Sequence, residues 1–265
     1  MIQFNDWEGP SAPNFSHFKD FCICCEQSGK EMNKEHFYPQ WLLRRTKTQK
    51  DLFSSPYGEI PADQITVRLC KDCNSKLGKE LESPVSKVFD CIESGKGFND
   101  YEAELLIRWM WKITGVFYWS ICNDRWKYGA ITLKERVLSR ISYPRDRLAL
   151  AISLIHDSEE NFGCAPVGLD VFPLFSNVYA AGVFSKLCLV VLYSSYMREV
   201  EKEGWTVYRL NNSPNVLNLE KRIIPAVGFQ TSREAVAYVK RNFGNGSAIC
   251  KEHEVIALQV LTAKG

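Results

Sequence analysis

Two cysteine pairs in the first third of the chain have the spacing of metal ligands. Cys22 and Cys25 form one C-x2-C pair, and Cys70 and Cys73 form the other. Four thiolates can close a tetrahedral shell around zinc, with Zn–S distances of about 2.3 Å. Four sulfur ligands also suit an iron–sulfur centre, but a closed zinc site needs no redox role. We therefore expect structural Zn²⁺ here, with four unrelated buried thiols as the alternative. Cys24 could compete for the metal, but the spacing favours its neighbours.

Between the two pairs lies a dipeptide whose residue types are suited to acid–base catalysis. A histidine beside a carboxylate, as in Glu35-His36, is suited to general-base chemistry. Carboxylate and amide oxygens, such as those of Glu35 and Asn74, can hold a hard divalent cation. The alternative for His36 is a core histidine. The alternative for Asn74 is a helix N-cap, which is compatible with binding an ion.

Together these residues resemble the HNH endonucleases, the ββα-metal nucleases, and most closely their zinc-stapled branch. That branch has the pattern CxxC, EHxxP and CxxCN, followed by a glycine and an acidic residue. The residues already named match it, with Pro39, Gly78 and Glu82 completing the pattern over about a quarter of the chain. The middle residue of the HNH triplet is a departure, because Asp63 and Gln64 lie near its place and neither is Asn.

The resemblance implies a metal-dependent endonuclease that hydrolyses phosphodiester bonds in DNA, with RNA not excluded. It assigns His36 as the general base and Glu35 and Asn74 as ligands of a catalytic Mg²⁺ or Mn²⁺. Glu82 would reach the same ion or face solvent. The ion would stabilise charge on the phosphoryl group and the leaving oxygen. Nucleases of this kind serve phage defence, restriction or mobile elements.

Contacts to nucleic acid must come from local clusters of basic residues. The net charge is +2, but residues 1–100 hold 13 Lys and Arg against 15 Asp and Glu. Since phosphate contacts usually dominate affinity for nucleic acid, we expect Arg44, Arg45 and Lys47 to supply them, with a solvated loop as the alternative. The arginines between residues 108 and 147 form a second candidate cluster.

Two other functions are compatible with these residues. One is a non-catalytic zinc module that binds nucleic acid, favoured by the acidic balance of residues 1–100 and by the missing middle Asn. Retention of Glu35, His36 and Asn74 argues against it, because binding alone needs none of them. The other is a nuclease subunit that a protein partner directs to its target.

Composition places the chain among ordinary globular proteins. Its hydrophobic content is 45%, and the sequence has no apolar run long enough to span a membrane. The N-terminal residues lack the pattern of a signal peptide, so we expect a cytoplasmic protein. In a reducing cytosol the cysteines outside the zinc site are expected as buried thiols.

The expected fold is α+β in three parts. These are an HNH-like zinc module over residues 15–98, a helical connector over 99–143 and a small α+β domain over 144–265. The last could serve recognition, regulation, a protein partner or homo-oligomer contacts. Hydrophobic periodicity predicts a strand at 65–69, a helix over 74–93 with a kink or break at Pro84, and helices over 101–121 and 132–142. In the last part, apolar and β-branched runs predict strands at LALAISLIH, NVYAAGVF, KLCLVVLYS and TVYRL, a helix over 233–243, and a strand or helix at 254–261.

Overall fold

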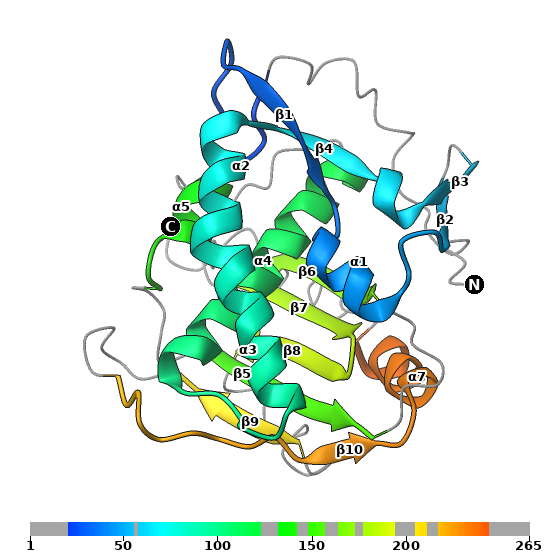
Figure 1. Ribbon diagram of the computed structural model, residues 1–265, viewed down its shortest axis with the longest axis vertical. Helices are drawn as coiled ribbons and strands as arrows, with labels where there is room; N and C mark the ends of the chain where they lie inside the picture. The colour runs from blue at the N-terminus through cyan, green and yellow to red at the C-terminus, as the bar shows by residue number, and fades with distance from the viewer. Residues whose placement is uncertain are drawn as a thin grey trace, which may run out of the picture.

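The computed structural model describes residues 21–55, 58–122, 132–141, 148–156, 164–172, 177–193, 205–210 and 217–243. Helices and sheets are mixed along these residues, so the prediction of an α+β fold is confirmed (Figure 1). The predicted element at 254–261 lies outside the described residues. None of the described helices combines the length and the apolar character needed to cross a membrane.

The segment between the cysteine pairs forms a two-stranded ribbon followed by a helix. Strand β1 (Met32–His36) pairs antiparallel with β4 (Thr66–Cys70), and α2 (Lys71–Leu77) follows β4 at once. The strand predicted at 65–69 is therefore confirmed. The connection between the strands contains α1 (Gln40–Thr46), a hairpin of β2 (Leu52–Ser55) and β3 (Gly58–Pro61), and a 3-10 turn, η2 (Ala62–Gln64). Sequence analysis did not predict this hairpin.

The helix after the ribbon runs through three consecutive segments. These are α2, a π-helical turn η3 (Gly78–Glu82) and α3 (Ser83–Glu93). The predicted start at residue 74 is three residues late, because the Cys70 side chain caps α2 by accepting from the Cys73 N–H at 3.5 Å. Pro84 lies in the first turn of α3, where its missing N–H costs little. The expected irregularity is thus a π turn just before Pro84.

Helix α4 (Asp100–Cys122) is the central element of the molecule. Its side chains from residue 103 to residue 116 are all buried, and they include three charged residues, Glu104, Arg108 and Lys112. Helix α5 (Leu133–Leu138) packs against it and begins with a capping box between Thr132 and Glu135. Both helices were predicted, the second four residues too long at its C-terminal end.

The rest of the chain builds a six-stranded sheet. Its strands are β5 (Leu148–Ile155), β6 (Cys164–Phe172), β7 (Asn177–Phe184), β8 (Leu187–Tyr193), β9 (Thr206–Arg209) and β10 (Val227–Phe229). The order is β10-β5-β8-β7-β6, with β9 also paired to β5, and only β10 runs parallel to its neighbour. Helix α7 (Ser232–Phe243) follows β10. The predicted strands at β5, β7, β8 and β9 and the predicted helix at α7 are confirmed, whereas β6 and β10 were not predicted.

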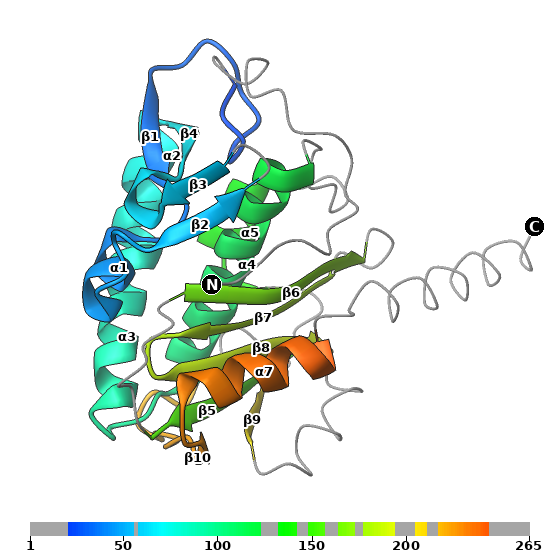
Figure 2. The same cartoon turned by 90° about the vertical axis from the view of Figure 1, so that its right-hand side faces the viewer.

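Both faces of the sheet are covered, α4 lying on one side and α7 on the other (Figures 1 and 2). Leu148, Leu150 and Ile152 of β5 belong to a buried cluster that reaches the cysteines of the ribbon. The alternate residues Ala149 and Ala151 pack with α7. The first cluster crosses residues 98 and 143, the two predicted domain boundaries, which stay predictions.

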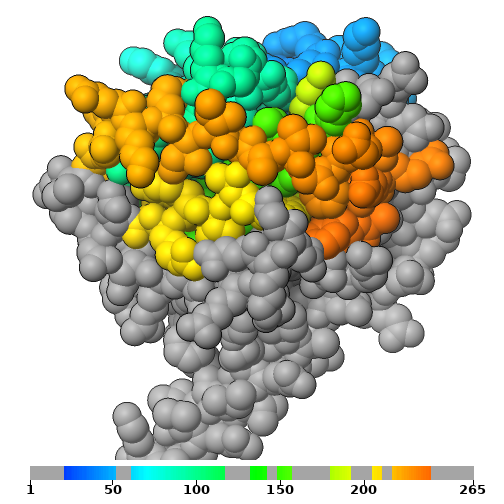
Figure 3. All heavy atoms as spheres, turned by 90° about the horizontal axis from the view of Figure 1, so that it is seen from below, coloured from blue at the N-terminus to red at the C-terminus, as the bar shows by residue number. Residues whose placement is uncertain are grey.

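The extended segment before β10, residues 217–226, forms hydrogen bonds with the loop that connects α3 to α4. Figure 3 shows this segment in orange, beside the end of α3 and β9. Ile223 pairs with Phe98 through two backbone hydrogen bonds, of 2.7 and 2.9 Å. Arg222 donates to the carbonyls of Lys96 and Gly97, both at 2.7 Å. The start of α4 is therefore held by residues more than a hundred positions later in the chain.

Candidate functional site

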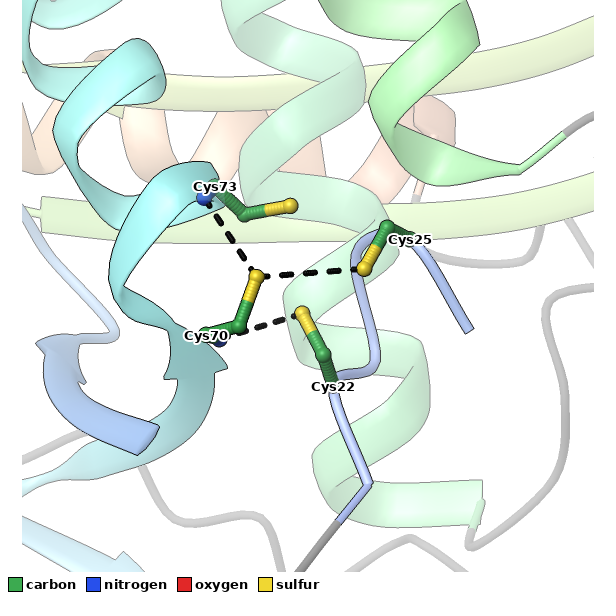
Figure 4. Close-up of side chains that lie close together, drawn as sticks. All are labelled: Cys22, Cys25, Cys70 and Cys73. Carbon is green, nitrogen blue, oxygen red and sulfur yellow. Dashed lines mark hydrogen bonds between the residues drawn. The ribbon is translucent and has the colours of Figure 1, made fainter. Parts of the chain in front are cut away.

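The four predicted zinc ligands lie together, with their sulfurs pointing toward one another (Figure 4). The ligand atoms of Cys22, Cys25, Cys70 and Cys73 all lie within 4.8 Å of one another. Cys25 Sγ and Cys70 Sγ are 3.8 Å apart, and bonds of about 2.3 Å in a tetrahedral zinc site require a similar separation of about 3.8 Å. The Cys70 N–H donates to Cys22 Sγ at 3.2 Å. Donor set and spacing therefore fit Zn²⁺, and Cys24 is buried nearby but outside the cluster.

These thiols are poor acids in this environment. Contact with Cys73 and burial raise the pKa of Cys22 to about 12. Burial also raises the pKa of Cys25. The contact with Cys22 lowers the pKa of Cys73, but contact with Cys24 and burial outweigh it and leave that pKa well above its usual value. Since zinc binds thiolates, occupation of the cluster by Zn²⁺ would release protons.

Helix α5 packs against the first cysteine pair. The Lys134 N–H donates to the Cys24 carbonyl at 2.8 Å, and Lys134 Nζ lies 3.1 Å from Asp72 Oδ2 on α2. The connector thus bridges both halves of the cysteine cluster. Sequence analysis gave no reason to expect this contact.

The ribbon places Glu35 and His36 on different faces. Side chains alternate along a strand, and Glu35 lies opposite the buried Val67 while His36 lies opposite Thr66. Glu35 therefore faces the interior. His36 is half-buried at the end of β1, on the outer face that also carries the exposed Lys34.

Asn74 lies on α2 beside the same strand. Its Nδ2 donates to the Lys34 carbonyl at 3.4 Å, next to the Glu35 peptide. The N-cap alternative for Asn74 is wrong, because Cys70 caps α2 and Asn74 sits one turn into the helix. The structure therefore brings Asn74 close to the strand that carries Glu35 and His36.

A lysine of the central helix lies between the two predicted acidic ligands. Lys112 is fully buried, and its Nζ donates to Glu35 Oε1 at 2.8 Å and lies 3.0 Å from Glu82 Oε1. Burial lowers the pKa of Lys112, but the carboxylates of Glu82 and Glu35 outweigh it and raise the pKa well above its usual value. Lys112 is thus an ammonium ion at neutral pH, and the three side chains sum to a charge of −1.

Glu82 is held from two further sides. Its Oε2 accepts from the indole N–H of Trp41 at 2.8 Å and of Trp109 at 3.2 Å. The residue is 7% exposed, so the alternative that it faces solvent is wrong. It ends the π turn η3, and such turns are frequent at functional sites. Sequence analysis missed Lys112, although a lysine inside the apolar run WMWKITG was a signal, because lysine is rarely buried unpaired.

The three basic residues proposed to contact nucleic acid have different surroundings. Arg44 on α1 and Lys47 at its end are exposed. Arg45 instead donates to Glu93 at 2.7 Å and pairs with Asp90, while its guanidinium lies 5.8 Å from the Trp41 ring centroid. The contacts of Arg45 therefore join α1 to α3.

The arginines of the connector also make internal contacts. Arg140 makes a bidentate pair with Glu104, at 2.7 and 2.8 Å. Arg108 donates to the carbonyls of Leu138 and Ser139 at the end of α5, and Arg136 stacks over Trp111. These three arginines join α4 to the α5 segment. Arg125, Arg145 and Arg147 lie outside the described residues, so the second basic cluster stays a prediction.

Comparison with known proteins gives no relative: no family model, no curated protein and no solved structure matches the chain. A functional proposal therefore rests on the ribbon, the cysteine cluster and the residues around Lys112.

Proposed function

We propose that this protein is a zinc-stapled, HNH-type endonuclease that hydrolyses phosphodiester bonds in nucleic acid, with DNA as the expected substrate. One observation carries the proposal. A strand–strand–helix unit, closed at one end by four converging cysteines, places Asn74 against the strand of Glu35 and His36. The expected setting in phage defence, restriction or a mobile element, and a protein partner or second copy on the C-terminal part, stay predictions.

The residues of this unit fit distinct roles in hydrolysis. His36, half-buried on the outer face, would accept the proton of the attacking water. Glu35 and Asn74 would hold Mg²⁺ or Mn²⁺, a hard cation that suits their oxygens and supplies charge stabilisation at the phosphoryl group. Glu82 was expected as a third ligand, but its oxygens already meet Trp41, Trp109 and Lys112. We therefore assign Glu82 to holding Lys112.

Exposed basic side chains next to His36 support a polyanionic substrate. Lys34 and Arg68 lie directly opposite each other on the ribbon, and both are exposed. Like charges in such a pair destabilise a ribbon, and a phosphate group bound between them would offset that cost. Because Lys34 lies two residues before His36, this pair shares the face of the proposed base.

Cleavage of plasmid DNA and of single-stranded RNA, with Mg²⁺ or Mn²⁺, tests the proposal. Glu35→Ala and Asn74→Ala should lose activity through weaker binding of the divalent ion, so excess Mn²⁺ should partly restore it. His36→Ala should not respond to Mn²⁺, because added metal replaces no proton acceptor. His156→Ala is the matched control, since His156 is exposed at the end of β5 in another part of the molecule. Equal cleavage by both histidine variants would contradict the assignment.

A non-catalytic zinc module that binds nucleic acid is the second candidate. It is favoured by Lys112, which already places a positive charge against Glu35, where the nuclease requires a divalent ion. In that case the chain would bind DNA with a strong dependence on salt, and neither Mg²⁺ nor Mn²⁺ would produce cleavage.

A further inference from the structure

Helix α4 carries one ammonium group into apolar surroundings. Lys112 is fully buried, and so are Trp109 and Trp111 on the same helix. A buried charge is costly unless partners compensate it. Here two carboxylates do so, which leaves the group with one negative charge in excess.

The hydrogen bond of Lys112 is directed at Glu35. Glu82 Oε1 accepts no hydrogen bond, although Lys112 Nζ lies 3.0 Å from it, so this contact is an ion pair without good alignment. Two indoles hold the other oxygen of Glu82. Glu82 therefore anchors the ammonium, and Glu35 is the slightly more exposed of the two carboxylates, with 15% of its side chain accessible against 10% for Glu82.

This arrangement opposes a divalent cation at Glu35. Lys112 Nζ lies 2.8 Å from Glu35 Oε1, so a divalent ion held by the same carboxylate would be a close neighbour of the ammonium. Charges of +2 and +1 at about 5 Å weaken binding by about tenfold even in water, and by more in a partly buried site. Lys112, Glu35 and Glu82 together carry a net charge of −1. A divalent cation that is also bound to phosphate groups can therefore still bind beside them.

We propose that Lys112 is the chain's own cation in this site and lowers the affinity of Glu35 for a divalent ion, so that Mg²⁺ or Mn²⁺ binds firmly only together with the phosphate groups of the substrate. The proposal rests on the proposed function for the identity of that substrate. The competition between Lys112 and the ion requires no cleavage, and it can be measured without any.

Binding of Mn²⁺ to the zinc-loaded full-length chain, followed by the electron paramagnetic resonance of free Mn²⁺, tests the proposal. Lys112→Met keeps the length of the side chain and removes its charge, so Mn²⁺ should bind about tenfold tighter or more than to wild type. Adding a short DNA duplex should tighten Mn²⁺ binding to wild type. The matched control is Lys87→Met, which removes the same charge from the exposed side of α3 and should leave Mn²⁺ binding unchanged.

Two further variants keep the test decisive. Lys112→Met combined with Glu35→Gln should lose the gain, because the ligand is removed with its competitor. If Lys112→Met does not fold, the double variant Lys112→Met with Glu82→Gln takes its place, because it removes one positive and one negative charge and so keeps the net charge of the group at −1. Its Mn²⁺ affinity is then compared with that of wild type. Mn²⁺ should also raise the melting temperature of the Lys112 variant more than that of wild type.

The results separate this inference from the proposed function. If Lys112→Met, or Lys112→Met with Glu82→Gln where the single variant does not fold, binds Mn²⁺ no tighter than wild type, the role of Lys112 is overturned, whether or not the protein cleaves DNA. Tighter Mn²⁺ binding by these variants supports that role, and absence of cleavage by wild type would then overturn the nuclease alone.

Discussion

Neighbouring basic residues on α1 differ in what they contact, so the proposed binding of nucleic acid and the stability of the fold can be tested separately. Arg44 and Lys47 are exposed beside the proposed site, whereas Arg45 lies over Trp41 and pairs with Glu93 and Asp90 of α3. Three residues that are neighbours in the sequence thus have two kinds of surroundings, exposed for Arg44 and Lys47 and paired with α3 for Arg45. The sequence does not show this difference, because the partners of Arg45, Asp90 and Glu93, lie more than forty residues away in the chain.

We expect Arg44→Ala combined with Lys47→Ala to weaken DNA binding about equally for all sequences and to reduce the dependence of log Kd on log salt by about 2. The melting temperature should stay near that of wild type. Filter binding or fluorescence anisotropy at several salt concentrations measures the effect. An unchanged salt dependence would favour a solvated loop.

Arg45→Ala is the contrasting variant. It should leave the salt dependence of DNA binding nearly unchanged and destabilise the fold by about 1 kcal/mol, because partly exposed ion pairs contribute little each. Urea unfolding measures the loss. A large fall in DNA affinity without loss of stability would show instead that Arg45 contacts the nucleic acid.

At the scale of elements, the loop before α4 requires glycine at position 97 for two reasons, its backbone conformation and the close approach of another segment. Gly97 has φ +68°, and a Cβ there would lie 2.2 Å from the Ile223 carbonyl oxygen. Gly95 has φ +78° but open space around it. The two glycines therefore share the left-handed backbone and differ only in contact with the segment before β10.

Gly95→Ala should destabilise the protein by about 1 kcal/mol, the strain of a left-handed alanine. Gly97→Ala should cost about 2–4 kcal/mol, since it also forces the Ile223 backbone away from Phe98. Urea unfolding of both variants gives the comparison. Equal losses would show that the segment before β10 does not hold the start of α4.

Elements with a long apolar run could be predicted from the sequence, and those without one could not. The central helix and the strands β5, β7 and β8 read as such runs, which are typical of elements covered on both faces. Strand β6 contains Pro166, at a register irregularity on the edge of the sheet, which hides its pattern. Strand β10 has three residues, too few for any pattern to be read.

The same limit applies to the candidate site. Spacing alone located the four cysteines, and the structure brings them together. Lys112 could not be paired with its partner in advance, because Glu35 lies 77 positions away and nothing in either segment specifies the contact. The tertiary packing of α4 determines that Lys112 contacts Glu35.

At the scale of the whole molecule, one buried cluster connects the cysteines, α4 and one face of the sheet. The cysteine cluster is therefore part of the main core, and a structural zinc ion held there would contribute folding energy directly. We expect one equivalent of zinc in the purified protein and a single unfolding transition. Removal of the metal with a chelator, or Cys70→Ser, should lower the melting temperature by at least about 10 °C.

Metal analysis and differential scanning calorimetry check this prediction together. Cys91→Ser is a suitable control, because Cys91 is a half-buried free thiol outside the cluster. A soluble, folded protein without zinc, whose melting temperature is unaffected by chelator, would contradict the zinc assignment.

Cleavage of supercoiled plasmid by wild type, His36→Ala and His156→Ala, in Mg²⁺ or Mn²⁺, tests the central claim most directly. We predict that wild type and His156→Ala convert the plasmid at similar rates. His36→Ala should be slower by about 10²- to 10⁴-fold, because the general base acts in the transition state, and its DNA affinity and melting temperature should be retained. If His36→Ala cleaves as fast as wild type, in preparations free of contaminating nuclease, the proposed mechanism is wrong.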